Sequence, residues 1–199
     1  MLNSEQTYEM LTERERDFVL AADAGMNDIS LLVLDIVRNS LEADATEIEL
    51  IVNENDDSVA VVVRDNGKGI EKPAAALSLL YTSRKTRRVG MGLPLFRAKA
   101  EMTGGTFGIT SNTGTEHGTV VTTEFIKNAK KSIPIGCMVE TVVSIVSGLG
   151  DSELRFSHTV HDKVITFDTH DIRDILGGTP LTTPMVLKWI SEYLTEQYK

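Results

Sequence analysis

Residues 27–44, NDISLLVLDIVRNSLEAD, carry apolar side chains three and four positions apart, and two strand patterns follow them directly. This spacing predicts an amphipathic helix with Asn27 or Asp28 as its N-cap. Apolar and polar residues alternate over Glu47–Asn53, and Val59–Val63 is an unbroken apolar run typical of a buried strand. The first part of the chain is therefore expected to combine a helix with a sheet.

The rest of the chain continues to alternate between helix and strand patterns. Helices are predicted at 73–80, Leu93–Thr103 and Cys137–Ser147, in a short stretch capped by Thr169, and from Thr183-Pro184, where Val186, Trp189, Ile190 and Tyr193 form one stripe. Strands are predicted at Thr106–Ser111 and Thr119–Ile126, and at Leu154–Val160 and Lys163–Asp168 as a hairpin across His161-Asp162. The polar stretch Asn128–Pro134 predicts a boundary between a main domain at 1–128 and a small α+β appendage at 129–199.

The charge balance narrows the classes of partner. The 199 residues include 29 acidic and 20 basic side chains, a net charge of −9. Because nucleic acids and anionic membranes attract basic surfaces, neither is an expected partner. Cys137 is the only cysteine, which excludes an internal disulfide and a cysteine-based zinc cage. No apolar run reaches the roughly 18 residues of a membrane span, and the polar N-terminus lacks a signal-peptide core, so a cytoplasmic protein is expected.

Asp35 and Asn39 are the first pair of residues that suggests chemistry. They lie one turn apart on the predicted helix and share a face. An Asn side chain offers Mg²⁺ a neutral oxygen ligand, and an Asp can accept a proton from a nucleophile. Taken alone, such a pair is more often an ordinary solvated helix face.

The second segment is Asp65-Asn66-Gly67-Lys68-Gly69-Ile70, which comes directly after a predicted buried strand. An Asp at a strand end can accept a hydrogen bond from an exocyclic amine, and glycines let the backbone approach a flat ligand. The same residues also make a good ordinary turn, and in isolation the turn is favoured.

The third segment is Gly90-Met91-Gly92-Leu93, which opens a predicted helix after a basic loop with Arg84, Lys85, Arg87 and Arg88. Glycines before a helix expose backbone N–H groups at its positive end, where anions bind. A solvated basic loop explains these residues equally well. No P-loop, dinucleotide fingerprint or kinase signature set is present.

In this order and spacing, the three segments resemble the GHKL superfamily of ATP-binding domains, which includes gyrase, heat-shock chaperone, histidine-kinase and MutL-type ATPases. The likeness covers about residues 15–126. LDIVRNSLEADATEIEL is similar to the N-box, especially its MutL-type version, and RDNGKGI to the first glycine box. VGMGLPLFRAKAEMTGGTFGITS resembles the second glycine box of histidine kinases and anti-sigma-factor kinases, and GTVVTTEF resembles the closing strand.

The resemblance implies the Bergerat fold, an α/β sandwich whose mixed, mainly antiparallel sheet carries helices on one face. It also implies a site for ATP and Mg²⁺. In that site Asn39 would ligate Mg²⁺, Asp65 would bind the adenine amino group and Thr119 would support the adenine site. The other implied ATP-binding residues are Gly67, Gly69 and Ile70 in the first glycine box, Arg84 and Lys85 in the lid, and Gly90, Gly92 and Leu93 around the phosphates.

Asp35 stands where ATP-hydrolysing and serine-kinase members of the superfamily have a Glu as general base. An Asp can also polarise water or a hydroxyl, but its side chain is one methylene shorter. A shortfall of roughly 1 Å can cost on the order of 100-fold in rate. Slow turnover and nucleotide binding with little turnover therefore both stay open.

The resemblance leaves three functions open. They are an ATP-dependent kinase or switch acting on a partner protein, a MutL-like ATPase that changes its dimer state, and a nucleotide-sensing module that signals through 133–199. The first is favoured because the charge does not suit DNA and no histidine precedes the helix at 27–44. The four histidines, His117, His158, His161 and His170, are expected to be surface or hairpin residues. The last helix, with Trp189, Tyr193 and Tyr198, is either a partner face or, more often at this spacing, simply packed.

Overall fold

The structure is a computed structural model that describes residues 27–77 and 92–199. The predicted lead-in at 1–25 and nearly all of the predicted lid therefore lie outside the described residues. None of the described helices combines the length and the apolar character that a bilayer crossing requires.

Helix α2 (Ile29–Glu42) begins at Asp28, as the sequence predicts. The Asp28 carboxylate accepts a hydrogen bond from the backbone N–H of Leu31 at 2.9 Å, which is the usual N-cap contact. The apolar stripe of α2 is buried along its whole length, from Ile29 through Val33 to Val37. Both the helix and its cap are confirmed.

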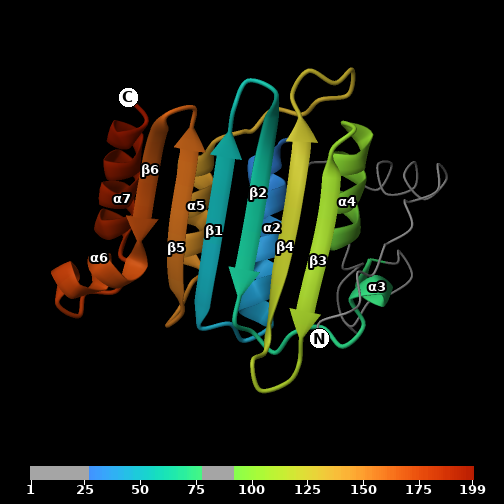
Figure 1. Ribbon diagram of the computed structural model, residues 1–199. Helices are drawn as coiled ribbons and strands as arrows, with labels where there is room; N and C mark the ends of the chain where they lie inside the picture. Colours follow the sequence, from blue (N-terminus) through green and yellow to red (C-terminus); the bar gives the residue numbers. More distant parts are fainter. Residues whose placement is uncertain (1–26, 78–91) are drawn as a thin grey trace.

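Six strands of the described residues form one sheet with the order β3-β4-β2-β1-β5-β6 (Figure 1). The strands are β1 (Glu47–Glu54), β2 (Ser58–Asp65), β3 (Thr106–Asn112), β4 (Gly118–Ile126), β5 (Glu153–Val160) and β6 (Lys163–Asp168). Neighbouring strands are antiparallel except β1 and β5, which are parallel. The expected mixed, mainly antiparallel sheet is confirmed.

Helices cover one face of this sheet. The other helices are α3 (Pro73–Ala76), α4 (Gly92–Met102), α5 (Met138–Ser147), α6 (Thr169–Leu176) and α7 (Pro184–Gln197). Figure 1 shows α2, α4 and α5 behind the sheet, and no described helix in front of β1 and β2. Because side chains alternate along a strand, Leu50 and Val52 of β1 and Val61 and Val63 of β2 point to the helices, and they are at most 1% exposed. The core lies between these two layers.

The residues after the predicted boundary continue the same sheet. Strand β5 pairs with β1 over the full length of both strands, and α5 packs against α2. Apolar residues of β5 and α5, such as Phe156 and Val142, belong to the same core as those of β1 and α2. The division into domains at 1–128 and 129–199 stays a prediction, and the sheet runs across it.

Thr169 does not have its predicted role as a cap. The side chain of Asp168 caps α6 instead, accepting from the N–H of His170 at 2.9 Å. Thr169 is fully buried inside the first turn, and its Oγ1 accepts from the backbone N–H of Leu154 at 2.7 Å. A buried backbone N–H needs a partner, which explains why the hydroxyl faces β5 rather than the helix end.

Candidate functional site

The carboxylate of Asp65, at the end of β2, is held by three hydrogen bonds. Its Oδ2 accepts from Ser40 Oγ at 2.7 Å, and its Oδ1 accepts from the N–H groups of Gly67 at 2.9 Å and Thr119 at 3.2 Å. Ser40 belongs to α2 and Thr119 to β4, so one carboxylate joins the N-box helix, the first glycine box and the closing strand. These contacts fix the carboxylate on the helix-covered side of the sheet.

The first glycine box needs its glycines because backbone lies against them. A Cβ at Gly67 would lie 2.8 Å from the carbonyl oxygen of Ala43. Gly69 has a left-handed φ of +73°, and a Cβ there would lie 2.1 Å from the carbonyl oxygen of Asn112. Directly after it, the N–H of Ile70 donates to Ser111 Oγ at 2.7 Å. The box is therefore fastened between α2 and the end of β3.

Helix α4 begins at Gly92, directly against Asp35 and Asn39. A Cβ at Gly92 would lie 1.9 Å from Asp35 Oδ2 and 3.3 Å from Asn39 Nδ2. The glycine thus lets the positive end of α4, which carries no acidic residue in its first turn, approach the polar face of α2. Leu93, the next residue, packs in part against the core. The structure brings together the second glycine box and the N-box.

The residues at this junction fit a magnesium–phosphate group. The side chains of Asn39 and Asp35 are oxygen donors, which Mg²⁺ prefers, and both are partly buried. The space that a Cβ at Gly92 would fill leaves room for backbone N–H groups of α4 to face a phosphate. Of the other predicted site residues, Arg84, Lys85 and Gly90 lie outside the described residues.

Three polar residues of this region were not predicted as site residues. Ser40 and Ser111 gave a signal that could have been used, because each is a polar residue in a buried phase. Ser40 continues the apolar stripe of α2 and is 3% exposed, and Ser111 follows Phe107 and Ile109 on the helix-facing side of β3. His117, expected as a surface or hairpin residue, has its Nδ1 2.8 Å from the carbonyl oxygen of Gly67, a contact that no sequence pattern indicates.

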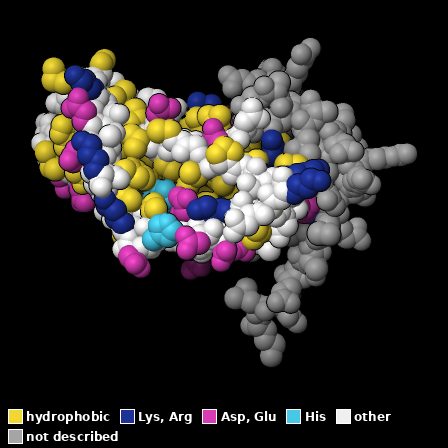
Figure 2. All heavy atoms as spheres, turned by 90° about the horizontal axis from the view of Figure 1, so that it is seen from above, with side chains coloured by type: hydrophobic (Ala, Val, Ile, Leu, Met, Phe, Trp, Pro, Cys, Tyr) yellow, Lys and Arg dark blue, Asp and Glu magenta, His cyan; other side chains and the backbone are white. Residues whose placement is uncertain are grey.

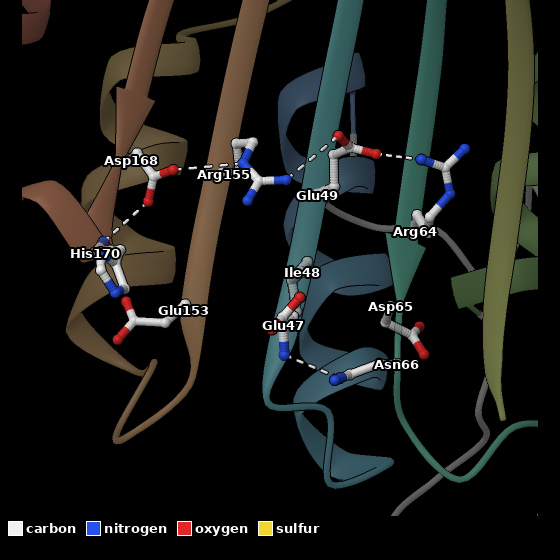
Figure 3. Close-up of a pocket in the computed structure, with 10 residues that line it drawn as sticks. All are labelled: Glu47, Ile48, Glu49, Arg64, Asp65, Asn66, Glu153, Arg155, Asp168 and His170. Carbon is white, nitrogen blue, oxygen red and sulfur yellow. Dashed lines mark hydrogen bonds and ion pairs between the residues drawn. The ribbon is translucent and has the colours of Figure 1, made fainter. Parts of the chain in front are cut away.

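The open face of the sheet carries a separate hollow of about 480 Å³ (Figure 3). Its charged side chains form a row across four strands, in which Arg64 pairs with Glu49, Glu49 with Arg155 at 3.9 Å, and Arg155 with Asp168 at 3.4 Å. Asp65 lines this hollow, yet its carboxylate is bound to Ser40, Gly67 and Thr119. The predicted nucleotide residues therefore gather on the helix side and not in this hollow.

The sequence model of the histidine kinase-, DNA gyrase B- and HSP90-like ATPases matches residues 26–130, just over half of the chain. The chain belongs to this family. The matched range begins just before α2 and ends after β4, so it contains the N-box, both glycine boxes and the closing strand. This GHKL ATPase domain is an ATP-binding domain by family. The roles of its individual site residues stay predictions.

Solved structures share the fold of this GHKL domain. The N-terminal domain of a DNA repair protein aligns with 85% of this chain at 14% identity and a TM-score of 0.54. Two nucleotide-free forms of the catalytic domain of histidine kinase ThkA align with 49% and 51% of it, at 24% identity and TM-scores of 0.39 and 0.40. These alignments cover 62% of the DNA repair domain and 65% and 67% of the kinase domains. A comparison with curated proteins found no match.

Proposed function

We propose that this GHKL domain is an Mg-ATP-dependent switch or protein kinase that acts on a partner protein. The observation that carries the proposal is the contact of Gly92 with Asp35 and Asn39, which sets a helix N-terminus against an oxygen-donor pair. Phosphoryl transfer depends mainly on positioning and charge neutralisation, and this junction offers both.

The residues divide the work as the superfamily resemblance implies. Asp65, oriented by Ser40, would accept a hydrogen bond from the adenine amino group. Asn39 would hold Mg²⁺, which supplies charge neutralisation at the phosphates when bound. The start of α4, at Gly92 and Leu93, would cover the phosphates with backbone N–H groups. Asp35 lies beside that position and would accept a proton from a water or a partner hydroxyl.

An assay with γ-labelled ATP and Mg²⁺ tests the proposal in the full chain. Native protein is compared with Asp35→Asn and Asn39→Ala, and free phosphate, protein-bound label and ATP binding are followed together. We expect Asn39→Ala to weaken Mg-dependent binding about 10-fold or more. Asp35→Asn should keep binding and lose about 100-fold or more of any turnover, the usual size of a general-base contribution.

Matched controls and outcomes make this assay decisive. Asp151→Asn and Asn53→Ala make the same chemical changes at exposed positions away from the junction, and both should behave like native protein. Binding with little release supports a switch, or a kinase that awaits its substrate. Rapid phosphate release that depends on Asp35 would favour a MutL-like hydrolase instead. Absence of ATP binding would overturn the proposal.

A further inference from the structure

Trp189 and Tyr193 form an exposed aromatic pair on α7. They lie one turn apart, and their rings stack with centroids 5.4 Å apart and planes at 17°. Each residue is 41% exposed, whereas Val186, Ile190 and Leu194 of the same helix are buried. The packing of α7 onto the rest of the protein therefore uses a different face of the helix. The stacked pair remains on the surface beside β6.

The aromatic pair forms one wall of a groove of about 530 Å³. The buried side chains of Phe167 and Ile172 also line this groove, and Ile175 of α6, which is 74% exposed, forms another part of its wall. Small-molecule sites enclose most of their ligand. Walls as exposed as these instead suit a polypeptide, which can cover them from outside, and Trp and Tyr are the residues that most often anchor such contacts.

The groove has an acidic rim. Three carboxylates line it, those of Glu49, Asp168 and Asp171, against the single guanidinium of Arg155 among the described lining residues. Arg155 is already shared between Glu49 at 3.9 Å and Asp168 at 3.4 Å. Asp171 is exposed and makes no ion pair within residues 27–77 and 92–199. The rim therefore offers a carboxylate that a basic side chain can pair with.

We propose that this groove, which we call the α6–α7 groove, docks a segment of a partner protein that presents an apolar side chain beside a Lys or Arg. The apolar side chain would lie on Trp189 and Ile175, and the basic group would pair with Asp171. A second copy of this chain is a poorer occupant, because each copy has a net charge of −9 and carries the same acidic rim. The groove lies away from the Asp35 and Asn39 junction, so docking does not require ATP turnover.

Fluorescence anisotropy with two labelled peptides tests this proposal on the full chain without nucleotide. One peptide of about 14 residues repeats Leu and Lys one helical turn apart, and its partner has Glu in place of every Lys. At about 0.15 M salt, which weakens non-specific charge attraction, only the Lys peptide should bind. Trp189→Ala should weaken its binding about 10-fold or more, and Asp171→Asn about 5-fold.

Matched controls lie on the same two helices. Met185→Ala removes a side chain that is 79% exposed on α7 but does not line the groove, and Asp174→Asn removes an acid of α6 outside it. Both should bind the Lys peptide like native protein. The proposal is overturned if native protein binds neither peptide or both equally, or if Trp189→Ala has no effect. Self-association that Trp189→Ala abolishes in sedimentation experiments would assign the groove to a second copy instead.

Discussion

Ser40 donates the shortest of the three hydrogen bonds to Asp65, from a helix position that is otherwise part of an apolar stripe. Hydrogen bonds to charged groups contribute about 1.5–3 kcal/mol. Without the Ser40 hydroxyl, the Asp65 carboxylate would lose its fixed orientation toward an adenine. We therefore expect Ser40→Ala to weaken ATP binding about 10-fold in isothermal titration. Ser147→Ala is the control, because its hydroxyl bonds only within the exposed end of α5. Equal affinity in native protein and Ser40→Ala would show that adenine binding does not need this bond.

Gly69 and Gly104 allow the effect of backbone strain to be separated from that of a clash. Both have left-handed φ angles, +73° and +82°, but a Cβ at Gly104 meets no atom within 4 Å. We expect Gly104→Ala to cost about 1 kcal/mol of unfolding free energy, the usual penalty for this conformation. Gly69→Ala should cost about 2 kcal/mol more, because its Cβ overlaps the Asn112 carbonyl. Urea unfolding measures both, and equal losses would contradict the clash.

At the residue scale, the sequence identified Asp65 and the glycines because each has a local chemical reason to stand where it does. It did not identify the partners that hold them. Ser40 meets Asp65 across 25 positions, and His117 meets Gly67 across 50. Contacts of this kind depend on strand register and on the path of loops. Periodicity within one element does not contain that information.

Among the elements, α7 is tied to the sheet by a buried polar pair at its C-terminal end. The Nδ1 of His158, in β5, lies 2.7 Å from the hydroxyl of Tyr198. Burial raises the pKa of Tyr198, so this hydroxyl stays protonated and donates to Nδ1. The other ring nitrogen lies 3.6 Å from Glu54 Oε2. Figure 2 views this end of the molecule, where histidine side chains lie among acidic and basic ones.

The buried histidine predicts a pH dependence of stability. Burial lowers the pKa of His158 below its ordinary value of 6.5, although Glu54 opposes the shift. The unfolded chain therefore takes up a proton at a higher pH than the folded chain does. Stability should be kept above pH 6.5 and fall as the pH drops from 6.5 toward the folded-state pKa. Urea unfolding between about pH 7.5 and 5.5 should show this loss in native protein.

Two histidine variants separate this effect from general acid sensitivity. His158→Gln should reduce the loss of stability between these pH values. His161→Gln, at an exposed turn residue of the same hairpin, should keep it. The interpretation fails if the two variants have the same pH profile.

The stripe on α7 shows what periodicity predicts at the element scale. The spacing of Val186, Trp189, Ile190 and Tyr193 correctly predicts a helix. In the structure, Val186 and Ile190 are buried, while Trp189 and Tyr193 are half exposed. A period of 3.6 residues defines which side chains share a face. The neighbouring elements, here α5 and β6, decide how much of that face is covered.

For the molecule as a whole, the parallel pairing of β1 with β5 makes 1–128 dependent on 129–199. Without β5, strand β1 would become a sheet edge, and α2 would lose its contact with α5. We expect a fragment of residues 1–128 to unfold at lower urea concentration than the full chain, or to aggregate. Circular dichroism and gel filtration measure this, and adding the 129–199 fragment should restore the native midpoint. A 1–128 fragment as stable as the full chain would establish an independent domain.

The position of β1 also sets the timing of folding. Strand β1 starts at Glu47, and its parallel partner starts at Glu153, which is 106 positions later (153 − 47). At a synthesis rate of about 5–20 residues per second, roughly 5–20 s pass on the ribosome before β5 has been made. Strands β2 and β4, and the loops of the nucleotide site, are complete well before that. A nascent chain therefore carries a finished ATP-site sequence next to an open strand edge, and that interval is when chaperones would matter most to this protein.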